Sequence, residues 1–271
     1  MPLLDVNGTR VHFTDTGCPP GRPDAPVVVL GHSLLFSTTM WRDQVEALRS
    51  SYRCIAVDWR GQGRSPAAVS GYDMDALYAD LVGVIEHLDV GPVHYAGLSM
   101  GGFVGLRLAS RRPDLVRSLT LLDTSAGPED PEKVSRYRLL ATIYGLVGIR
   151  PLLGQVAPIM FSRLFLATPE GAQVVATWTG ELRQQGRRGT KGAIRGVTDR
   201  LPVSDEIRSV TAPTLVMVGA EDVATPVAKA KAIAAQIAGA RLEVLPGVGH
   251  VSTLEAPDAV TALLTKFLAE F

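Results

Sequence analysis

The chain has 271 residues, of which 46% are hydrophobic and 20% charged, a composition typical of a folded domain with a sizeable core. Lysine plus arginine and aspartate plus glutamate number 27 each, which argues against a nucleic-acid-binding protein that works by neutralising phosphates. The sequence shows neither an apolar run of membrane-spanning length nor the pattern of a signal peptide, so we expect a cytoplasmic protein that does not bind membranes.

Strand-like and helix-like segments alternate along most of the chain. Short apolar runs bounded by turn residues predict buried strands, and apolar residues at helical spacing predict helices. The predicted strands are residues 11–16, 26–31, 53–58, 93–97, 118–123, 214–219 and 242–245. Helices are predicted at residues 72–88, 227–237 and 257–271. This alternation favours an α/β fold, in which helices cover both faces of a largely parallel sheet.

The alternation stops in residues 127–208, which contain helical segments, several Gly and Pro residues and no clear strand. Because this region lies between two predicted strands, it indicates an insertion rather than a second domain in tandem. We therefore expect a core formed by residues 1–126 and 209–271 and a helical cap at 127–208. Ligand sites of α/β sheets lie beyond the carboxyl ends of the strands, so the cap is expected to cover such a site.

A glycine-rich turn follows the predicted strand 93–97. Residues 97–102 read Gly-Leu-Ser-Met-Gly-Gly and lead into a helical segment. A strand-to-helix turn this tight strains its central residue, and glycine neighbours avoid steric overlap. Such a turn exposes the Ser99 Oγ beside a helix N-terminus, so we predict Ser99 as a nucleophile. A Gly-x-Ser-x-Gly pattern alone is weak support; its position between a strand and a helix makes a simple tight turn the poorer explanation.

A serine nucleophile needs a base to take its proton, and His250 is the best placed of five histidines. Its glycine-rich loop follows the last predicted strand and can bring an imidazole over the sheet edge. The other four lie in predicted strands (His12, His94), on a helix (His87) or in a loop with another expected role (His32).

For the acid that orients this histidine, Asp222 follows the predicted strand 214–219. A carboxylate there can hold the imidazole tautomer and stabilise the imidazolium. Asp123, at the end of the preceding strand, and the adjacent Glu221 remain alternatives. The oxyanion formed during attack needs backbone N–H donors, which we expect from Leu34 and Met100.

With these residues placed, a resemblance becomes clear. The chain resembles the α/β-hydrolase superfamily over nearly its full length, and within it the 3-oxoadipate enol-lactonase and carboxylesterase group. The resemblance lies in residues 32–34, 40–44, 58–65, 97–102, 112–113, 122–126, 212–215, 222–226 and 249–250. Two departures concern the substrate. Residues 32–35 read His-Ser-Leu-Leu where enol-lactonases usually have Asn-Ser-Leu-Gly, and the cap matches poorly.

The resemblance implies Ser99 as nucleophile, Asp222 as acid, His250 as base, and Leu34 and Met100 as oxyanion donors, in the chain order of α/β-hydrolases. It implies hydrolysis of a small ester or lactone with no metal and no cofactor. The spacing of the two cysteines, Cys18 and Cys54, also fits no metal site and no disulfide framework.

Other functions remain open: carbon–carbon bond hydrolysis, perhydrolysis, or a non-catalytic small-molecule receptor. Epoxide hydrolases and haloalkane dehalogenases of this fold resemble the chain but have aspartate at the position of Ser99, so these are excluded. The oligomeric state is also open.

Three features of the sequence allow two interpretations each. Apolar residues at 139–140, 143–144, 146–147, 152–153 and 159–161 either roof a hydrophobic pocket or bury the underside of the cap. The pair Met40 and Trp41 either packs under the oxyanion loop or contacts substrate. A basic run either attracts a carboxylate-bearing substrate or forms a solvated surface; it comprises Arg183, Arg187, Arg188, Lys191, Arg195 and Arg200.

Overall fold

The computed structural model describes residues 3–271 and contains an eight-stranded sheet in the order β1-β2-β4-β3-β5-β6-β7-β8. Strand β2 runs antiparallel to its neighbours β1 and β4, and the remaining pairs are parallel. The strands are β1 (Leu3–Val6), β2 (Thr9–Asp15), β3 (Val27–Gly31), β4 (Arg53–Val57), β5 (Val93–Leu98), β6 (Val116–Leu122), β7 (Thr214–Gly219) and β8 (Arg241–Leu245). The predicted α/β architecture is thereby confirmed.

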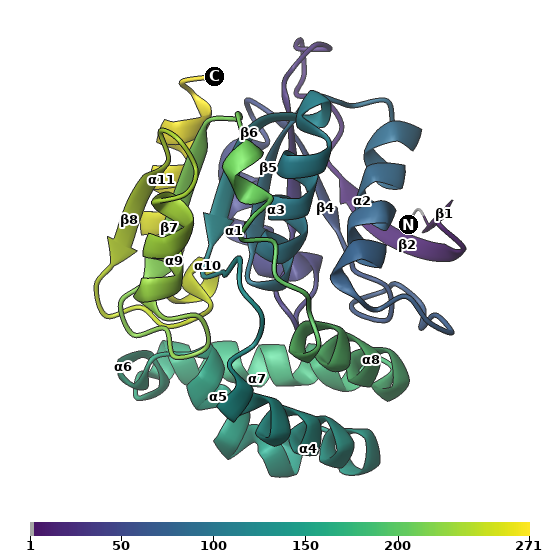
Figure 1. The fold of residues 1–271 in the computed structure, drawn as a ribbon, viewed down its shortest axis with the longest axis vertical. Helices are drawn as coiled ribbons and strands as arrows, with labels where there is room; N and C mark the ends of the chain where they lie inside the picture. The colour runs from purple at the N-terminus through teal and green to yellow at the C-terminus, as the bar shows by residue number, and fades with distance from the viewer. Residues whose placement is uncertain (1–2) are drawn as a thin grey trace.

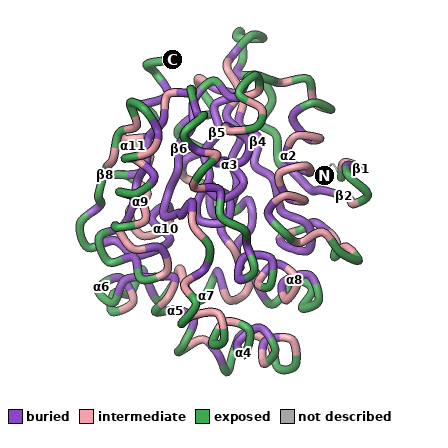
Figure 2. Tube along the Cα trace, in the orientation of Figure 1, coloured by how far each residue is buried: buried purple, intermediate pink, exposed green. Residues whose placement is uncertain are grey.

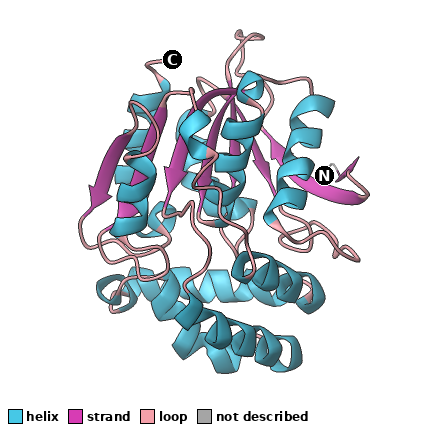
Figure 3. Ribbon diagram, viewed as in Figure 1, coloured by secondary structure: helices cyan, strands magenta, loops and turns pink. Residues whose placement is uncertain are grey.

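Helices cover both faces of this sheet (Figures 1 and 3). One face packs against α2 (Met74–His87), α3 (Met100–Arg111) and α9 (Val227–Ala234). The other packs against α1 (Arg42–Leu48) and α11 (Pro257–Leu268), while α10 (Ser252–Glu255) follows the loop after β8. Short 3₁₀ helices span Thr38–Trp41, Pro113–Leu115, Arg150–Leu152 and Ile207–Ser209.

Alternate residues of the central strands enter opposite halves of the core. In β3, Val28 and Leu30 pack on the α1–α11 side while Val29 packs on the α2–α3 side, and all three are fully buried. This is the two-residue period of a strand whose faces are both covered, and it explains why the central strands read as continuous apolar runs. Figure 2 shows that many of the buried residues, coloured purple, lie in these central strands.

Five α-helices lie between β6 and β7: α4 (Pro131–Val147), α5 (Leu153–Met160), α6 (Arg163–Leu166), α7 (Pro169–Gln184) and α8 (Arg187–Thr198). We call them the inserted helices. They gather at one end of the sheet (Figure 1). Trp178 Nε1 donates to the carbonyl of Leu35 at 2.9 Å, and the amide of Val251 donates to the carbonyl of Met160 at 3.0 Å. These bonds join the inserted helices to the loops that follow β3 and β8.

The predicted elements differ from the observed ones mainly at their ends. Strand β1 was not predicted, because its four residues are too few for a clear period and only Val6 is buried. The predicted helix 257–271 ends at Leu268, and the predicted helix 227–237 ends at Ala234. The division into a core and a cap stays a prediction. Within residues 3–271, no helix is both long enough and apolar enough to cross a bilayer.

Candidate active site

Ser99 occupies a strained turn between β5 and α3. Its backbone angles are φ 52° and ψ −108°, outside the regions that most non-glycine residues adopt. The turn brings α3 close to β3: a methyl group at Gly101 would overlap the carbonyl oxygen of Gly31, so only glycine fits there. The local sequence therefore forms the predicted turn, and Ser99 stands at the N-terminus of α3.

His250 lies directly over this serine. Its Nε2 is 2.9 Å from Ser99 Oγ, and its Nδ1 is 2.9 Å from Asp222 Oδ2. Because Nδ1 faces a carboxylate, it carries the ring proton and leaves Nε2 free to accept from the serine hydroxyl. The structure thus joins three predicted residues in one hydrogen-bonded chain, although they are far apart in the sequence.

Asp222 is itself held from several sides. Its Oδ1 accepts from the amides of Ala224 at 2.8 Å and Thr225 at 2.9 Å. The Thr225 hydroxyl donates to Oδ2 at 2.8 Å and lies 3.4 Å from His250 Nδ1. Burial alone raises the pKa of Asp222, but the charge of His250 and the hydrogen bonds from His250 and Thr225 lower it below the ordinary value. The carboxylate therefore stays ionised beside the imidazole.

The two alternative acids occupy other positions. The fully buried Asp123 accepts from the amide of Gly219 at 2.8 Å and from the hydroxyl of Ser252 at 2.5 Å, not from His250. Burial, followed by the charge of Asp222, raises its pKa. Glu221 is exposed. Asp123 thus links the end of β7, three residues before Asp222, to Ser252, two residues after His250, a contact that the sequence analysis did not predict.

The two predicted oxyanion donors both belong to segments next to Ser99. Leu34 lines the same pocket as Ser99, and Met100 is the first residue of α3. Within residues 3–271, neither amide donates a hydrogen bond to another protein group. Both amides therefore remain available to a ligand oxygen, and their role as oxyanion donors stays a prediction.

Several residues that the sequence analysis missed hold the loop of Leu34. His32 donates from Nδ1 to the carbonyl of Ser33 at 2.7 Å and accepts at Nε2 from the amide of Trp59 at 3.1 Å. Burial lowers the pKa of His32, consistent with a neutral ring in this double role. Gln62 Oε1 accepts from the amide of Leu35 at 3.0 Å. Gln62 belongs to the segment 58–65, which resembles the family in sequence, and in this structure it supports the loop of Leu34.

Met40 and Trp41 pack beneath this loop. Both are buried, and neither lines the pocket that contains Ser99. The sulfur of Met40 accepts from the amide of Ser33 at 3.2 Å. Of the two interpretations of this pair, the structure supports packing.

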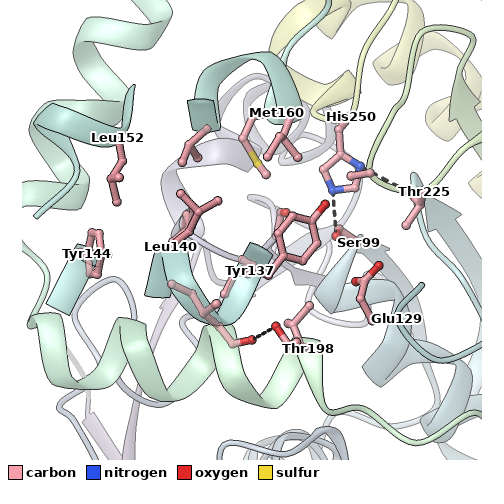
Figure 4. Close-up of a pocket in the computed structure, with 18 of the residues that line it drawn as sticks. Ser99, Glu129, Tyr137, Leu140, Tyr144, Leu152, Met160, Thr198, Thr225 and His250 are labelled. Carbon is pink, nitrogen blue, oxygen red and sulfur yellow. Dashed lines mark hydrogen bonds between the residues drawn. The ribbon is translucent and has the colours of Figure 1, made fainter. Parts of the chain in front are cut away.

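A pocket of about 810 Å³, counting its open mouth, extends from Ser99 between the inserted helices (Figure 4). Its walls are mostly apolar and include Leu140, Tyr144, Leu152, Ile159 and Met160, which supports the roof interpretation for these residues. In Figure 4 the hydroxyl end of Tyr137 points toward the part of the pocket near Ser99 and His250. Burial is the main reason that the pKa of Tyr137 is raised to about 12. Its hydroxyl therefore stays protonated and can donate a hydrogen bond.

The pH dependence of any reaction at Ser99 should follow His250. Burial alone lowers the pKa of His250, but the charge and hydrogen bond of Asp222 raise it above its ordinary value of 6.5. Only the neutral ring can take the serine proton, so activity is lost as the pH falls through this raised pKa. We expect the acid limb of kcat/KM for an uncharged ester to have its midpoint above about 6.5. A midpoint below 6 would contradict this assignment.

Within the described part of the chain, no group of three or more His, Cys, Asp or Glu side chains is arranged to hold a metal ion. Cys18 is exposed and Cys54 is buried, and the two are not joined in a disulfide. The polar side chains that line the pocket include Ser99, His250, Thr225, Tyr137 and Glu129.

Comparison with known proteins places this arrangement in context. A family model described as alpha/beta hydrolase fold matches residues 26–257. The chain is 26% identical over 251 residues to the 3-oxoadipate enol-lactonase 2 of Acinetobacter baylyi, with 91% of each chain covered.

Two solved structures are also similar over nearly the whole chain. The first is the enol-lactonase of Burkholderia xenovorans LB400, with 29% identity, a TM-score of 0.90, and coverage of 99% of this chain and 100% of that one. The second is a thermophilic esterase of Thermogutta terrifontis, with 27% identity, a TM-score of 0.89, and coverage of 100% of this chain and 99% of that one.

Proposed function

The chain belongs to the alpha/beta hydrolase family, and from this premise we propose that it is a serine hydrolase acting on carboxylic ester or lactone bonds of small substrates. The observation that carries the proposal is the hydrogen-bonded chain from Ser99 Oγ through His250 to Asp222. Serine is a weak nucleophile until a base takes its proton, and this geometry supplies the base and the group that orients it.

In the proposed cycle, Ser99 Oγ attacks the carbonyl carbon while its proton passes to His250 Nε2. The carbonyl oxygen becomes an oxyanion, which the amides of Leu34 and Met100 stabilise. When the tetrahedral species collapses, the bond to the leaving oxygen breaks and His250 gives its proton to that oxygen. An acyl group then remains on Ser99. Asp222 stays ionised and stabilises the imidazolium in both steps.

Water completes the cycle by the same route. His250 takes a proton from water, the resulting hydroxide attacks the acyl carbon, and the oxyanion forms at the same two amides. Collapse of this second tetrahedral species returns the proton to Ser99 Oγ and releases the acid. Each step uses groups of this chain and water alone.

The names of the similar proteins support the reaction class. Two are enol-lactonases and one is an esterase, and all three names denote cleavage of a bond between an acyl carbon and oxygen. Three alternatives remain. Carbon–carbon bond hydrolysis would use Ser99 on a different substrate bond, and perhydrolysis would transfer the acyl group to peroxide instead of water. A receptor would bind a small molecule without turnover. A substrate panel separates them.

The test is hydrolysis of 4-nitrophenyl esters of increasing acyl length, together with several lactones, by the wild-type protein. Each methylene buried in an apolar pocket contributes about 0.8 kcal/mol, so kcat/KM should rise by up to about fourfold per carbon until the pocket is full. The chain length at the maximum then measures the space under the inserted helices. Turnover of no ester and no lactone would contradict the proposed function.

A further inference from the structure

The pocket that contains Ser99 has an unusual distribution of charge. Among its lining residues within 3–271, Glu129 is the one acidic side chain, and neither lysine nor arginine lines the pocket. Glu129 lies in the loop between β6 and α4, with 8% of its surface exposed. Figure 4 shows its side chain on the same side of the pocket as Ser99.

The positive partner of Glu129 lies behind the pocket wall. Arg200 Nη1 donates to Glu129 Oε2 at 2.8 Å and to the carbonyl of Val197 at 2.9 Å, and its Nε donates to the carbonyl of Gly127 at 3.1 Å. The guanidinium stacks on the ring of Phe103, with Cζ 4.3 Å from the ring centre. Arg200 is buried and is not part of the pocket lining. The ion pair therefore presents its negative end to the substrate.

The basic run on the inserted helices does not compensate for this arrangement. Arg183, Arg187, Arg188 and Arg195 are exposed and Lys191 is partly exposed, and these five residues do not line the pocket. For these five residues the structure supports the interpretation as a solvated surface, whereas the sixth member of the run, Arg200, is buried.

We propose that the pocket selects uncharged esters or lactones with apolar acyl groups and rejects carboxylate-bearing ones, with Glu129 as the residue that sets this discrimination. The proposal rests on the proposed function and names its substrate class. A carboxylate entering this pocket would lose its hydration and find a carboxylate in place of a cation. An apolar acyl chain instead meets the aliphatic and aromatic walls.

The test compares esters that differ only at the far end of the acyl group: 4-nitrophenyl pentanoate and mono-4-nitrophenyl glutarate. The methyl ester of the second compound is a control that is polar but uncharged. The Ser99→Ala variant measures the background, including spontaneous hydrolysis assisted by the glutarate carboxylate. We expect wild-type kcat/KM for the pentanoate to exceed that for the glutarate by about 100-fold or more.

The outcomes are distinct. If none of the three esters is hydrolysed, the proposed function itself fails. If the pentanoate and the glutarate are hydrolysed equally well, or the glutarate better, the proposed function stands and the charge selection is overturned. A preference for the glutarate would mean that a substrate carboxylate reaches Arg200, whose Nη2 has no hydrogen-bond partner in the described residues.

Glu129→Gln tests the residue itself. It removes the negative charge while keeping the side-chain shape, so the ratio of glutarate to pentanoate activity should rise about tenfold or more. Glu132→Gln, the same change at an exposed position on α4, is the matched control and should leave the ratio unchanged. An unchanged ratio in a folded Glu129→Gln variant overturns the role of Glu129. If that variant does not fold, the wild-type comparison still decides the selection.

Discussion

Replacing Ser99 with alanine is expected to lower kcat for the best ester of the panel by about 10⁵-fold or more. The variant retains the amides of Leu34 and Met100 but lacks the oxygen that forms the acyl-enzyme. Within residues 3–271 the Ser99 hydroxyl hydrogen-bonds to His250 alone, and the bond from the Thr124 hydroxyl to the Ser99 carbonyl at 2.8 Å does not depend on that hydroxyl, so the change should leave the fold intact. Steady-state kinetics measure the loss, and thermal unfolding checks the fold.

Ser110→Ala is the matched control for this variant. Ser110 lies on the same helix, α3, where its hydroxyl donates to the carbonyl of Leu106 at 2.8 Å. Its replacement should leave kcat within about a factor of two of the wild type, since exposed or local hydroxyl changes have small effects. Retention of more than about one hundredth of the activity by Ser99→Ala would show that another group is the nucleophile.

Asp222→Asn is expected to lower kcat by about 10⁴-fold. The asparagine carbonyl can still accept from the amides of Ala224 and Thr225, so the loop should keep its shape. The amide group, however, neither stabilises the imidazolium nor holds the proton on His250 Nδ1. The tautomer that places the proton on Nε2 cannot accept from Ser99. Saturation kinetics with the best ester measure this loss.

Asp123→Asn separates the two candidate acids. Asp123 bonds to Gly219 and Ser252 and not to His250, so its replacement should reduce kcat much less than Asp222→Asn does. The assignment would be reversed if Asp123→Asn caused the larger loss while Asp222→Asn remained active.

The elements that carry these residues could be predicted from local sequence. The apolar run 26–31 and the strand-like run 93–97 are buried on both faces, so their composition alone indicates central strands. The turn at Ser99 could also be predicted, because its glycines are required where α3 approaches Gly31. The pairing of His250 with Ser99 followed from the position of each loop at the carboxyl end of a strand.

Contacts between distant segments could not be predicted in this way. The bond from Trp178 to the carbonyl of Leu35 joins residues 143 positions apart, and neither residue type indicates its partner. The pair of Glu129 and Arg200 is similar: Arg200 ends a basic run whose other members lie on the surface. The sequence shows only that the run is basic. The packing of Arg200 against Phe103, which sets this residue apart from the rest of the run, is visible only in the structure.

The most direct test of the nucleophile is labelling with a fluorophosphonate probe, which reacts with activated serine hydroxyls, followed by mass spectrometry of the intact protein and of its peptides. We predict one adduct per chain, on the peptide that contains Ser99, and its absence in Ser99→Ala and in wild-type protein treated below the pKa of His250. No adduct at neutral pH, or an adduct on another residue that persists in Ser99→Ala, would contradict the assignment of Ser99 as the nucleophile of a serine hydrolase.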